Sequence, residues 1–344
     1  MATKLSDVAS FAGVSLATVR RVLNDQPFIA QETRDRVLTA LDVLGHERPA
    51  KFRRGRAGLV GLVVPDLQNP IFPAFVESVS AGLVKQGLMP VLCTRTADGV
   101  SEANYIKLLM DHDVAGIIFI GSSYADAGPE YSRELRERGI PLVLINPADS
   151  NEKVCRVSVD DAAAVDQALS HLGSLGHTRV GMVLGPVGHI PSARKLGAFV
   201  AHCERNGVGA GAWRNLVVHT GFSIEDGRAA TTRLLTSDSA ADRTALSCTA
   251  LICASDALAL GAVRAAYRLG MTVPGHLSVI GFDDSPYMIA TDPPLTTVRQ
   301  PVRAMAAAAA EALKTQISGH VVLGEETLYE PELIVRASTG IARH

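Results

Sequence analysis

The sequence predicts a small all-α head followed by an α/β core of two doubly wound lobes with parallel sheets. Three observations support this prediction. Residues 5–44 hold three short segments with apolar residues at helical spacing. From residue 59 onward, apolar runs alternate with segments of helical length, which is typical of parallel sheets covered by helices on both faces. The strand-like runs are residues 59–64, 90–94, 115–120, 141–146, 179–185, 216–219, 250–255 and 277–282, and the helical segments are 73–86, 101–112, 129–139, 161–175, 192–206, 223–236 and 256–269. Some eight strands are too many for one small sheet, so two lobes are expected.

The head begins with the stretch LSDVASFAGVSLATVRRVLN, residues 5–24. Its first helix has apolar residues at helical spacing until Gly13 breaks the pattern. Ser15 is a good N-cap for a second helix, because its hydroxyl can accept a hydrogen bond from a first-turn amide. The third segment, ETRDRVLTALDVLG, closes a small core with an apolar face made of Val37, Leu41 and Leu44.

The second helix has two different faces. Its apolar face consists of Val19, Val22 and Leu23. The opposite face consists of Leu16, Ala17, Arg20 and Arg21. A turn with glycine between two such helices is the helix-turn-helix pattern, whose second helix enters the major groove of DNA. A surface helix with solvated arginines is the alternative that these twenty residues leave open.

The charge distribution favours the DNA-binding interpretation. The chain of 344 residues is 47% hydrophobic and 20% charged, which is typical of a globular protein with two or three domains. Its net charge of -2 hides an asymmetry: residues 1–58 hold ten Lys or Arg and six Asp or Glu, whereas residues 59–344 hold 23 and 29. A basic head on an acidic body indicates a DNA-binding module attached to a separate domain.

The sequence predicts a cytoplasmic protein without cofactor or metal. The start, MATKLSDVASF, lacks the basic and apolar regions of a signal peptide, and no apolar run reaches membrane-spanning length. The cysteines form no CxxC pair and are odd in number, so we expect reduced core residues at Cys93, Cys155, Cys203, Cys248 and Cys253.

Between head and body lies the basic stretch HERPAKFRRGRAG, residues 46–58. One interpretation is a solvated linker. The other is that its cations neutralise phosphates and that Phe52 is an apolar wedge in the minor groove. In the body, ligands are expected beyond the carboxyl ends of the strands, where the sequence places Asn146, Ser255, Asp256, Asp283 and Asp284.

Motifs along nearly the whole chain resemble the LacI/GalR family of transcription regulators. They are DVASFAGVSLATVRRVLN, GLVVPDLQNPIF, AGIIFIGS, RERGIPLVLIN, VSVDDAAAVDQALSHLGSLGHTRVGMVLGP, ASDALALGAVRAA, VPGHLSVIGFDD, PPLTTVRQP and PELIVRASTG. The resemblance implies a helix-turn-helix domain (1–47), a hinge (48–58) and a core like that of periplasmic sugar-binding proteins (59–344). Three crossings would join an N-lobe, about 59–158 and 300–328, to a C-lobe, about 159–299 and 329–344.

The resemblance also implies residues that contact DNA. Base-reading positions fall on Leu16, Ala17, Arg20 and Arg21, and backbone-contacting positions fall on Thr18 and Asn24. The hinge positions are Phe52, Arg53 and Arg54. Three features depart from the family: Arg20 stands where Ser is usual, Ala30 replaces a common Ser cap, and the hinge is about three residues shorter. The extra cation at Arg20 could read another base or bind phosphate. The usual operator preference therefore cannot be assumed.

In the core, the resemblance implies a small effector, sugar-like or nucleobase-like, bound between the lobes. The positions that match effector-binding residues of the family are Phe72, Asn146, Arg194, Phe222, Ser255, Asp283 and Gln300. Arg194 and Asp283 would act together on ligand hydroxyls or a base edge. Relatives often carry Asp and Asn at positions 146 and 255. The implied function is a repressor that binds a palindromic operator as a homodimer and responds to this effector.

Two other functions compete with this one: an α/β enzyme and a sugar-binding module. An α/β enzyme lacks support, because the sequence holds no HExxH, no P-loop and no GxSxG elbow. The acids of GFDDS could bind a metal, but no cluster of further ligands accompanies them. A sugar-binding module would fit the body alone, and the head argues against it.

Overall fold

The computed structural model describes residues 5–24, 26, 29–46, 58–95, 101–121, 133–135, 137–148, 154–207, 211–236, 248–320 and 324–343. The chain divides into two compact units, Met1–Leu59 and Val60–His344. The first unit holds the head helices and the second holds two six-stranded sheets.

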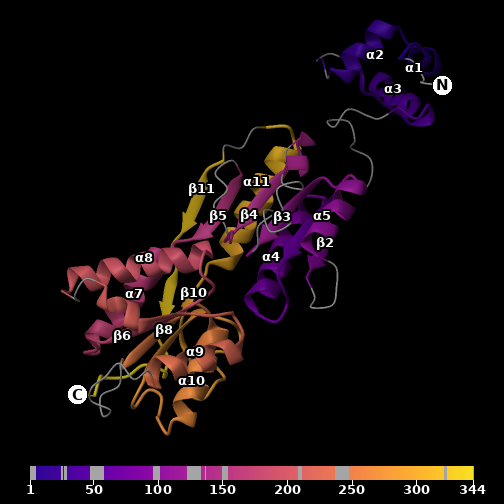
Figure 1. Ribbon diagram of the computed structural model, residues 1–344. Coiled ribbons are helices and arrows are strands. Elements are labelled where there is room, and N and C mark those ends of the chain that lie inside the picture. Colours follow the sequence, from indigo (N-terminus) through magenta and orange to yellow (C-terminus); the bar gives the residue numbers. More distant parts are fainter. Residues whose placement is uncertain are drawn as a thin grey trace. The chain divides into compact units, whose positions relative to one another are not determined.

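The head consists of α1 (Leu5–Ala12), α2 (Leu16–Leu23) and α3 (Gln31–Val43) (Figure 1). Their apolar faces meet in one cluster, whose fully buried members are Val8, Val19, Val22, Val37 and Ala40. Gly13 has a φ of 63° between α1 and α2, in the left-handed region that glycine adopts at little cost. The predicted three-helix head is confirmed.

The first sheet of the core has the strand order β11-β5-β4-β3-β1-β2. Its strands are β1 (Leu59–Val64), β2 (Met89–Thr94), β3 (Gly116–Ile120), β4 (Leu142–Ile145), β5 (Cys155–Val159) and β11 (Glu326–Tyr329). The helices that accompany it are α4 (Ile71–Lys85), α5 (Glu102–Asp111) and α11 (Val302–Ile317). β3 and β4 are buried at every position, as expected for strands covered on both faces.

The second sheet has the strand order β12-β10-β9-β8-β6-β7. Its strands are β6 (Val180–Leu184), β7 (Val217–His219), β8 (Ala250–Cys253), β9 (Ser278–Asp283), β10 (Thr296–Arg299) and β12 (Glu332–Ile334). Its helices are α7 (Asp161–Ser174), α8 (Ile190–Arg205), α9 (Ile224–Thr236) and α10 (Asp256–Arg268), with a short 3-10 helix at Ala212–Leu216. β12 runs antiparallel to β10, whereas the other described pairs are parallel.

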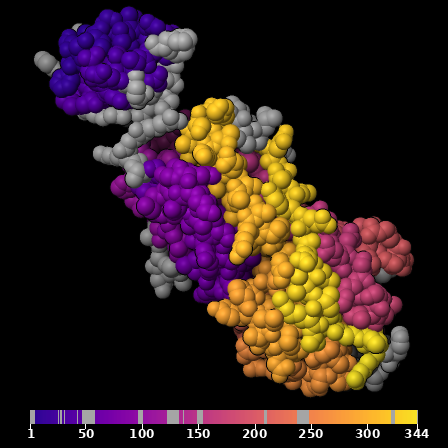
Figure 2. All heavy atoms as spheres, turned by 180° about the vertical axis from the view of Figure 1, so that it is seen from behind, coloured from indigo at the N-terminus to yellow at the C-terminus, as the bar shows by residue number. Residues whose placement is uncertain are grey.

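The chain passes between the two sheets three times. It leaves the first sheet after β5, returns after β10 to form α11, and crosses again between β11 and β12. Figure 2 shows the C-terminal residues, in yellow, extending over both lobes. Each lobe is therefore built from separate segments of sequence, and the predicted fold class is confirmed.

Four strands and one helix of the core were not predicted as elements. β5, β10, β11 and β12 are only three to five residues long, and their sequences (CRVSV, TTVR, ETLY and ELI) are interrupted by polar residues. These four strands lie next to the chain crossings between the lobes. β11 and β12 are edge strands, and β5 and β10 are their neighbours. The missed helix is α11, whose alanine-rich sequence packs against α4.

Candidate functional site

The second helix of the head, α2, is capped as the sequence predicts. The Ser15 hydroxyl accepts a hydrogen bond from the Thr18 backbone N–H at 3.1 Å and lies 2.9 Å from the Thr18 hydroxyl. At the other end, the Asn24 backbone N–H donates to the Arg20 carbonyl. Thr18 and Asn24, predicted to contact the DNA backbone, thus lie at the two ends of α2.

The predicted base-reading side chains share one exposed face of α2. The buried face of the helix carries Val19 and Val22, both with no exposed surface. The exposed residues on the other side are Leu16, Ala17, Arg20 and Arg21. The Arg21 Nε donates a hydrogen bond to Gln26 Oε1 at 3.2 Å. Two exposed guanidinium groups beside two short apolar side chains suit hydrogen bonds to guanine and contact with thymine methyl groups.

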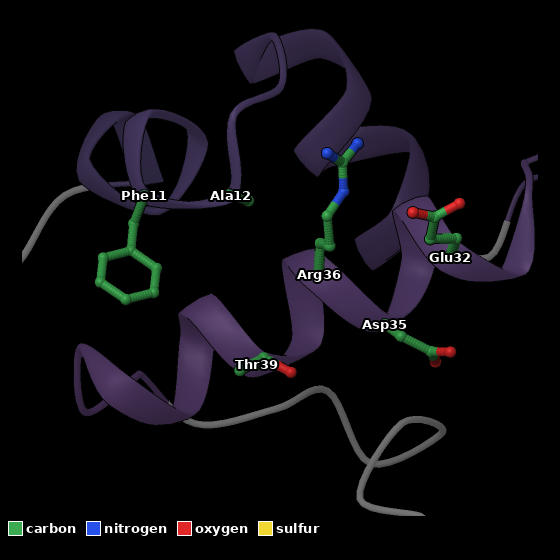
Figure 3. Close-up of a pocket in the computed structure, with 6 residues that line it drawn as sticks. All are labelled: Phe11, Ala12, Glu32, Asp35, Arg36 and Thr39. Atoms are coloured by element: carbon green, nitrogen blue, oxygen red, sulfur yellow. The ribbon is translucent and has the colours of Figure 1, made fainter.

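The predicted hinge contacts Phe52, Arg53 and Arg54 lie outside the described residues, so they stay predictions. A shallow hollow on the head is lined by α1 and α3 side chains, namely Phe11, Ala12, Glu32, Asp35, Arg36 and Thr39 (Figure 3). None of these residues belongs to α2, so the hollow lies apart from the base-reading face.

In the core, a chain of hydrogen bonds joins predicted effector residues from both lobes. The Asn146 side-chain amide donates to Gln300 Oε1 at 2.7 Å, and the Gln300 amide donates to Asp283 Oδ1 at 2.7 Å. Asn69 donates to the other carboxyl oxygen of Asp283 at 3.4 Å. Asn146 follows β4 of the first sheet, and Asp283 ends β9 of the second. Gln300, just after β10, therefore links the two lobes at their junction.

Asp283 is held in an unusual environment. Its φ is 115°, a conformation that residues with side chains seldom adopt. Asp283 as a whole is only 6% exposed to solvent. Burial, assisted by the charge of Asp256, raises the pKa of Asp283 well above its usual value, while hydrogen bonds from Gln300 and Asn69 act against this rise. Each carboxyl oxygen has two lone pairs and accepts one hydrogen bond from a protein amide, so acceptor capacity remains for a ligand hydroxyl.

The two predicted aromatic residues lie at strand ends. The Phe72 ring packs on Gly121, just after β3, where a Cβ atom would lie 2.3 Å from it. The Phe222 ring packs on Gly185, just after β6, where a Cβ atom would lie 2.1 Å from it. Its centroid is 5.1 Å from that of His189, edge to face. Glycine at both positions lets an aromatic ring lie directly over the carboxyl end of a strand.

Arg194 and Ser255, predicted to bind the effector, both make hydrogen bonds within the protein. Arg194 makes a two-pronged ion pair with Glu326 of β11, at 2.8 Å for each contact. The Ser158 hydroxyl donates to the same carboxylate at 2.6 Å. The Ser255 hydroxyl accepts from the Leu258 backbone N–H and caps α10. Arg194 thus pairs across the lobes with Glu326, and within the described residues it makes no hydrogen bond to Asp283.

Sequence reasoning missed two charged residues beside this site, Lys195 and Asp161. Lys195 is 3% exposed and forms an ion pair with Asp161, which is 2% exposed at the side chain. The sequence did contain an indication of this pair. The buried face of α8 consists of Ser192, Lys195, Phe199 and Cys203, and a lysine on a buried face requires a partner of opposite charge. The partner lies 34 residues away in sequence, where spacing gives no indication of it.

In the described part of the chain, no group of three or more His, Cys, Asp and Glu side chains is arranged to hold a metal ion. The helices described above also include none with the length and apolar character needed to cross a membrane.

Comparison with known proteins matches both parts of the chain. A family model described as "Bacterial regulatory proteins, lacI family" matches residues 4–48, and one described as "Periplasmic binding protein-like domain" matches residues 169–339. The HTH-type transcriptional regulator reg1 of Streptomyces lividans is 47% identical over 348 residues, which cover 99% of this chain and 98% of that protein. The repressor CytR of Escherichia coli (strain K12) is 30% identical, covering 98% and 96%.

A solved structure extends the match to three dimensions. The structure named "transcriptional regulator CelR-cellobiose complex" superposes with a TM-score of 0.71 at 29% identity, covering 98% of this chain and 99% of that one. The relatives are transcription regulators, a family that is not enzymatic, so the prediction of a regulator is confirmed. The chain belongs to the LacI family of bacterial transcription regulators.

Proposed function

We propose that this regulator is a repressor that binds a palindromic operator through two heads of a homodimer. The exposed face of α2, with Arg20 and Arg21 beside Leu16 and Ala17, is the observation that carries the proposal. One head offers few contacts, whereas a twofold dimer presents two recognition helices to two half-sites. Relatives named as repressors, such as CytR, support the direction of control.

The effector is a sugar that binds at the junction of the lobes. Asn69, Asn146, Gln300 and Asp283 supply several donors and acceptors in a small space. The rings of Phe72 and Phe222 offer apolar faces at the strand ends of the two lobes. Mixed polar groups and apolar faces suit a ligand with many hydroxyls, and the cellobiose complex of the relative CelR supports this class.

Control of DNA binding follows from a change in lobe closure. Hydrogen bonds through Gln300 and the ion pair of Arg194 with Glu326 join the lobes at different places. A sugar that replaces or completes these contacts favours one arrangement of the lobes. It changes operator affinity only if it binds the two arrangements with different affinity. Because the operator is chromosomal DNA, we place the protein in the cytoplasm.

The test is a fluorescence anisotropy titration with DNA from upstream of the protein's own gene and with scrambled DNA of equal length. At about 150 mM salt we expect binding to the first to be tighter by roughly a thousandfold. Addition of the effector sugar should shift this affinity, and cellobiose is the first candidate. Equal, weak binding to both DNAs, with and without sugars, contradicts the proposal.

A further inference from the structure

Gln26 lies beyond the end of α2 and is bonded to that helix at two points. α2 ends at Leu23, and the Gln26 backbone N–H donates a hydrogen bond to the Arg21 carbonyl at 3.0 Å. The Gln26 side-chain Oε1 accepts a hydrogen bond from Arg21 Nε at 3.2 Å. Both bonds join the same two residues, so the main chain fixes where the Gln26 amide lies relative to the Arg21 side chain.

The side-chain bond occupies one edge of the Arg21 guanidinium group. A guanidinium group has five N–H donors in a planar fork, and Gln26 accepts from the one on Nε. The other donors are on Nη1 and Nη2, and within the described part of the head no acceptor is bonded to them. An arginine bonds the O6 and N7 atoms of guanine with two neighbouring donors. With Nε occupied, the pair that remains is Nη1 with Nη2, which is an end-on approach.

The acceptor that holds Arg21 is uncharged. Several arginines of the core are paired with carboxylates instead, namely Arg138, Arg194, Arg228, Arg299 and Arg336. A carboxylate beside Arg21 would offset its positive charge and repel the phosphates of DNA. An amide oxygen orients the guanidinium group while its whole charge stays available for DNA.

The bond acts on a side chain that is otherwise free to move. Arg21 and Gln26 are both exposed, and an exposed arginine loses rotamer freedom when it is fixed against a base. A side chain that is already oriented loses less. Attraction to DNA of any sequence depends on charge, which Gln26 leaves unchanged. The bond is therefore expected to affect discrimination between bases more than affinity for DNA in general.

We propose that Gln26 is a positioning residue of the DNA-binding head, which presents the Nη1–Nη2 edge of Arg21 to a guanine of the operator. The inference rests on the proposed function, in which α2 reads the operator, and adds a residue and a geometry to it. The helical pattern of α2 gives no indication of Gln26, because the contact depends on how the chain turns back after the helix has ended.

The experiment first identifies the DNA and then measures discrimination. Selection from a pool of random double-stranded DNA with the full-length wild type gives the preferred operator. Fluorescence anisotropy then compares this operator with its single-base variants and with scrambled DNA. Gln26→Met removes the acceptor at similar side-chain length, and Gln26→Glu keeps an acceptor oxygen but adds a negative charge. Thr39→Met is the matched control, an exposed residue in the hollow of Figure 3, apart from α2.

We expect the wild type and Thr39→Met to prefer guanine at the same position of each half-site. Gln26→Met should lower this preference roughly three- to tenfold, with preferences at other positions and affinity for scrambled DNA unchanged. Gln26→Glu should keep the guanine preference and bind every DNA more weakly. Urea unfolding checks that each variant is folded.

A double-mutant cycle separates positioning from a direct contact of Gln26 with DNA. If Gln26 acts through Arg21, adding Gln26→Met to Arg21→Ala should not change discrimination further. An equal loss in the Arg21→Ala background and in the wild type would assign Gln26 to a DNA contact of its own and overturn the positioning role.

The other contrary outcomes concern the acceptor and the operator. An unchanged guanine preference in Gln26→Met overturns the inference, and the proposed function stands without it. A loss in Gln26→Glu as large as in Gln26→Met overturns it too, because the glutamate variant retains an acceptor. If the wild type enriches no DNA sequence from the pool, operator recognition by α2 fails, and this inference fails with it.

Discussion

Arg20 and Arg21 are neighbours on α2, yet their surroundings differ. The Arg21 Nε is held by Gln26, 3.2 Å away. For the Arg20 guanidinium, the described residues provide no hydrogen-bond partner. A guanidinium that is already oriented loses less freedom when it forms two hydrogen bonds with a guanine edge. Arg21 is therefore the better candidate for reading a base, and Arg20 for contact with a phosphate.

This difference predicts the effect of Arg21→Ala. The variant should lose about 1–3 kcal/mol of discrimination between operator variants at the base pair that Arg21 reads. Anisotropy titrations with a set of single-base operator variants measure this value. Arg36→Ala is the matched control, because Arg36 is an exposed arginine of α3 beside the hollow of Figure 3. A uniform loss on every operator for Arg21→Ala would assign Arg21 to the backbone instead.

At the same scale, the sequence predicts part of the candidate effector site and misses part. Asn146, Asp283 and Gln300 were predicted from family motifs, and the structure joins them by hydrogen bonds. The pairing of Arg194 with Glu326 spans 132 residues of sequence. It depends on where β11 enters the first sheet, and a motif comparison carries no information on that. Lys195 was not predicted as a site residue, because the family motif was matched to its neighbour Arg194.

At the scale of elements, long apolar runs were predicted well. β1, β3, β4, β6, β8 and β9 each correspond to a continuous apolar run within two residues at either end. β10 and β12 were missed because their short sequences mix polar with apolar residues. Such strands are stabilised by their place in the sheet, through pairing with β9 and with each other, more than by local sequence preference.

The C-terminal segment is held to the second lobe by His177, just before β6. Its Nδ1 lies 2.8 Å from the Thr249 hydroxyl, and its Nε2 lies 3.0 Å from both the Ser278 hydroxyl and the Gly340 carbonyl oxygen. Nearby, the Ala342 backbone N–H donates to the Leu175 carbonyl. Burial lowers the pKa of His177, and the Gly340 carbonyl acts against this. The folded state therefore favours the neutral imidazole.

This environment predicts a loss of stability on acidification. An unfolded histidine takes up a proton near pH 6.5, whereas His177 in the folded protein resists protonation. The stabilisation is thus complete above about pH 6.5 and falls as the pH drops toward the folded-state pKa. Urea unfolding at pH 8, 7, 6 and 5 should show this fall, and His177→Gln should reduce its slope.

Other histidines contribute to the remaining slope. The pKa of His171 is lowered by burial and by the charge of His177, and burial lowers the pKa of His189 to about 4, so some pH dependence should persist in His177→Gln. His171→Gln is the appropriate comparison, because its imidazole bonds only the Thr339 hydroxyl among the described residues. An identical pH dependence in the wild type and in His177→Gln would show that His177 does not couple folding to protonation.

At the scale of the whole molecule, the second lobe exposes large apolar side chains on two neighbouring segments, which we call the apolar patch. It consists of Tyr267 and Leu269 at the end of α10 and Tyr287 and Ile289 after β9. The two segments are neighbours, because the Tyr267 hydroxyl donates to the Asp292 carbonyl at 3.3 Å. Ile289 is 67% exposed and Tyr287 is 69% exposed. Large apolar side chains gathered on a surface indicate a protein contact, and a second copy of the chain is the partner that a palindromic operator requires.

The patch predicts that Ile289→Asp disrupts the dimer and, with it, operator binding. A buried carboxylate without a partner opposes association, so sedimentation at micromolar concentration should shift from dimer to monomer. Operator affinity should fall roughly a hundredfold, because two linked heads gain about 10²–10⁴ in avidity over one. Ile341→Asp is the matched control, since Ile341 is 80% exposed and lies outside the patch. If Ile289→Asp remains a dimer with wild-type operator affinity, the two heads are brought together by another surface of the core.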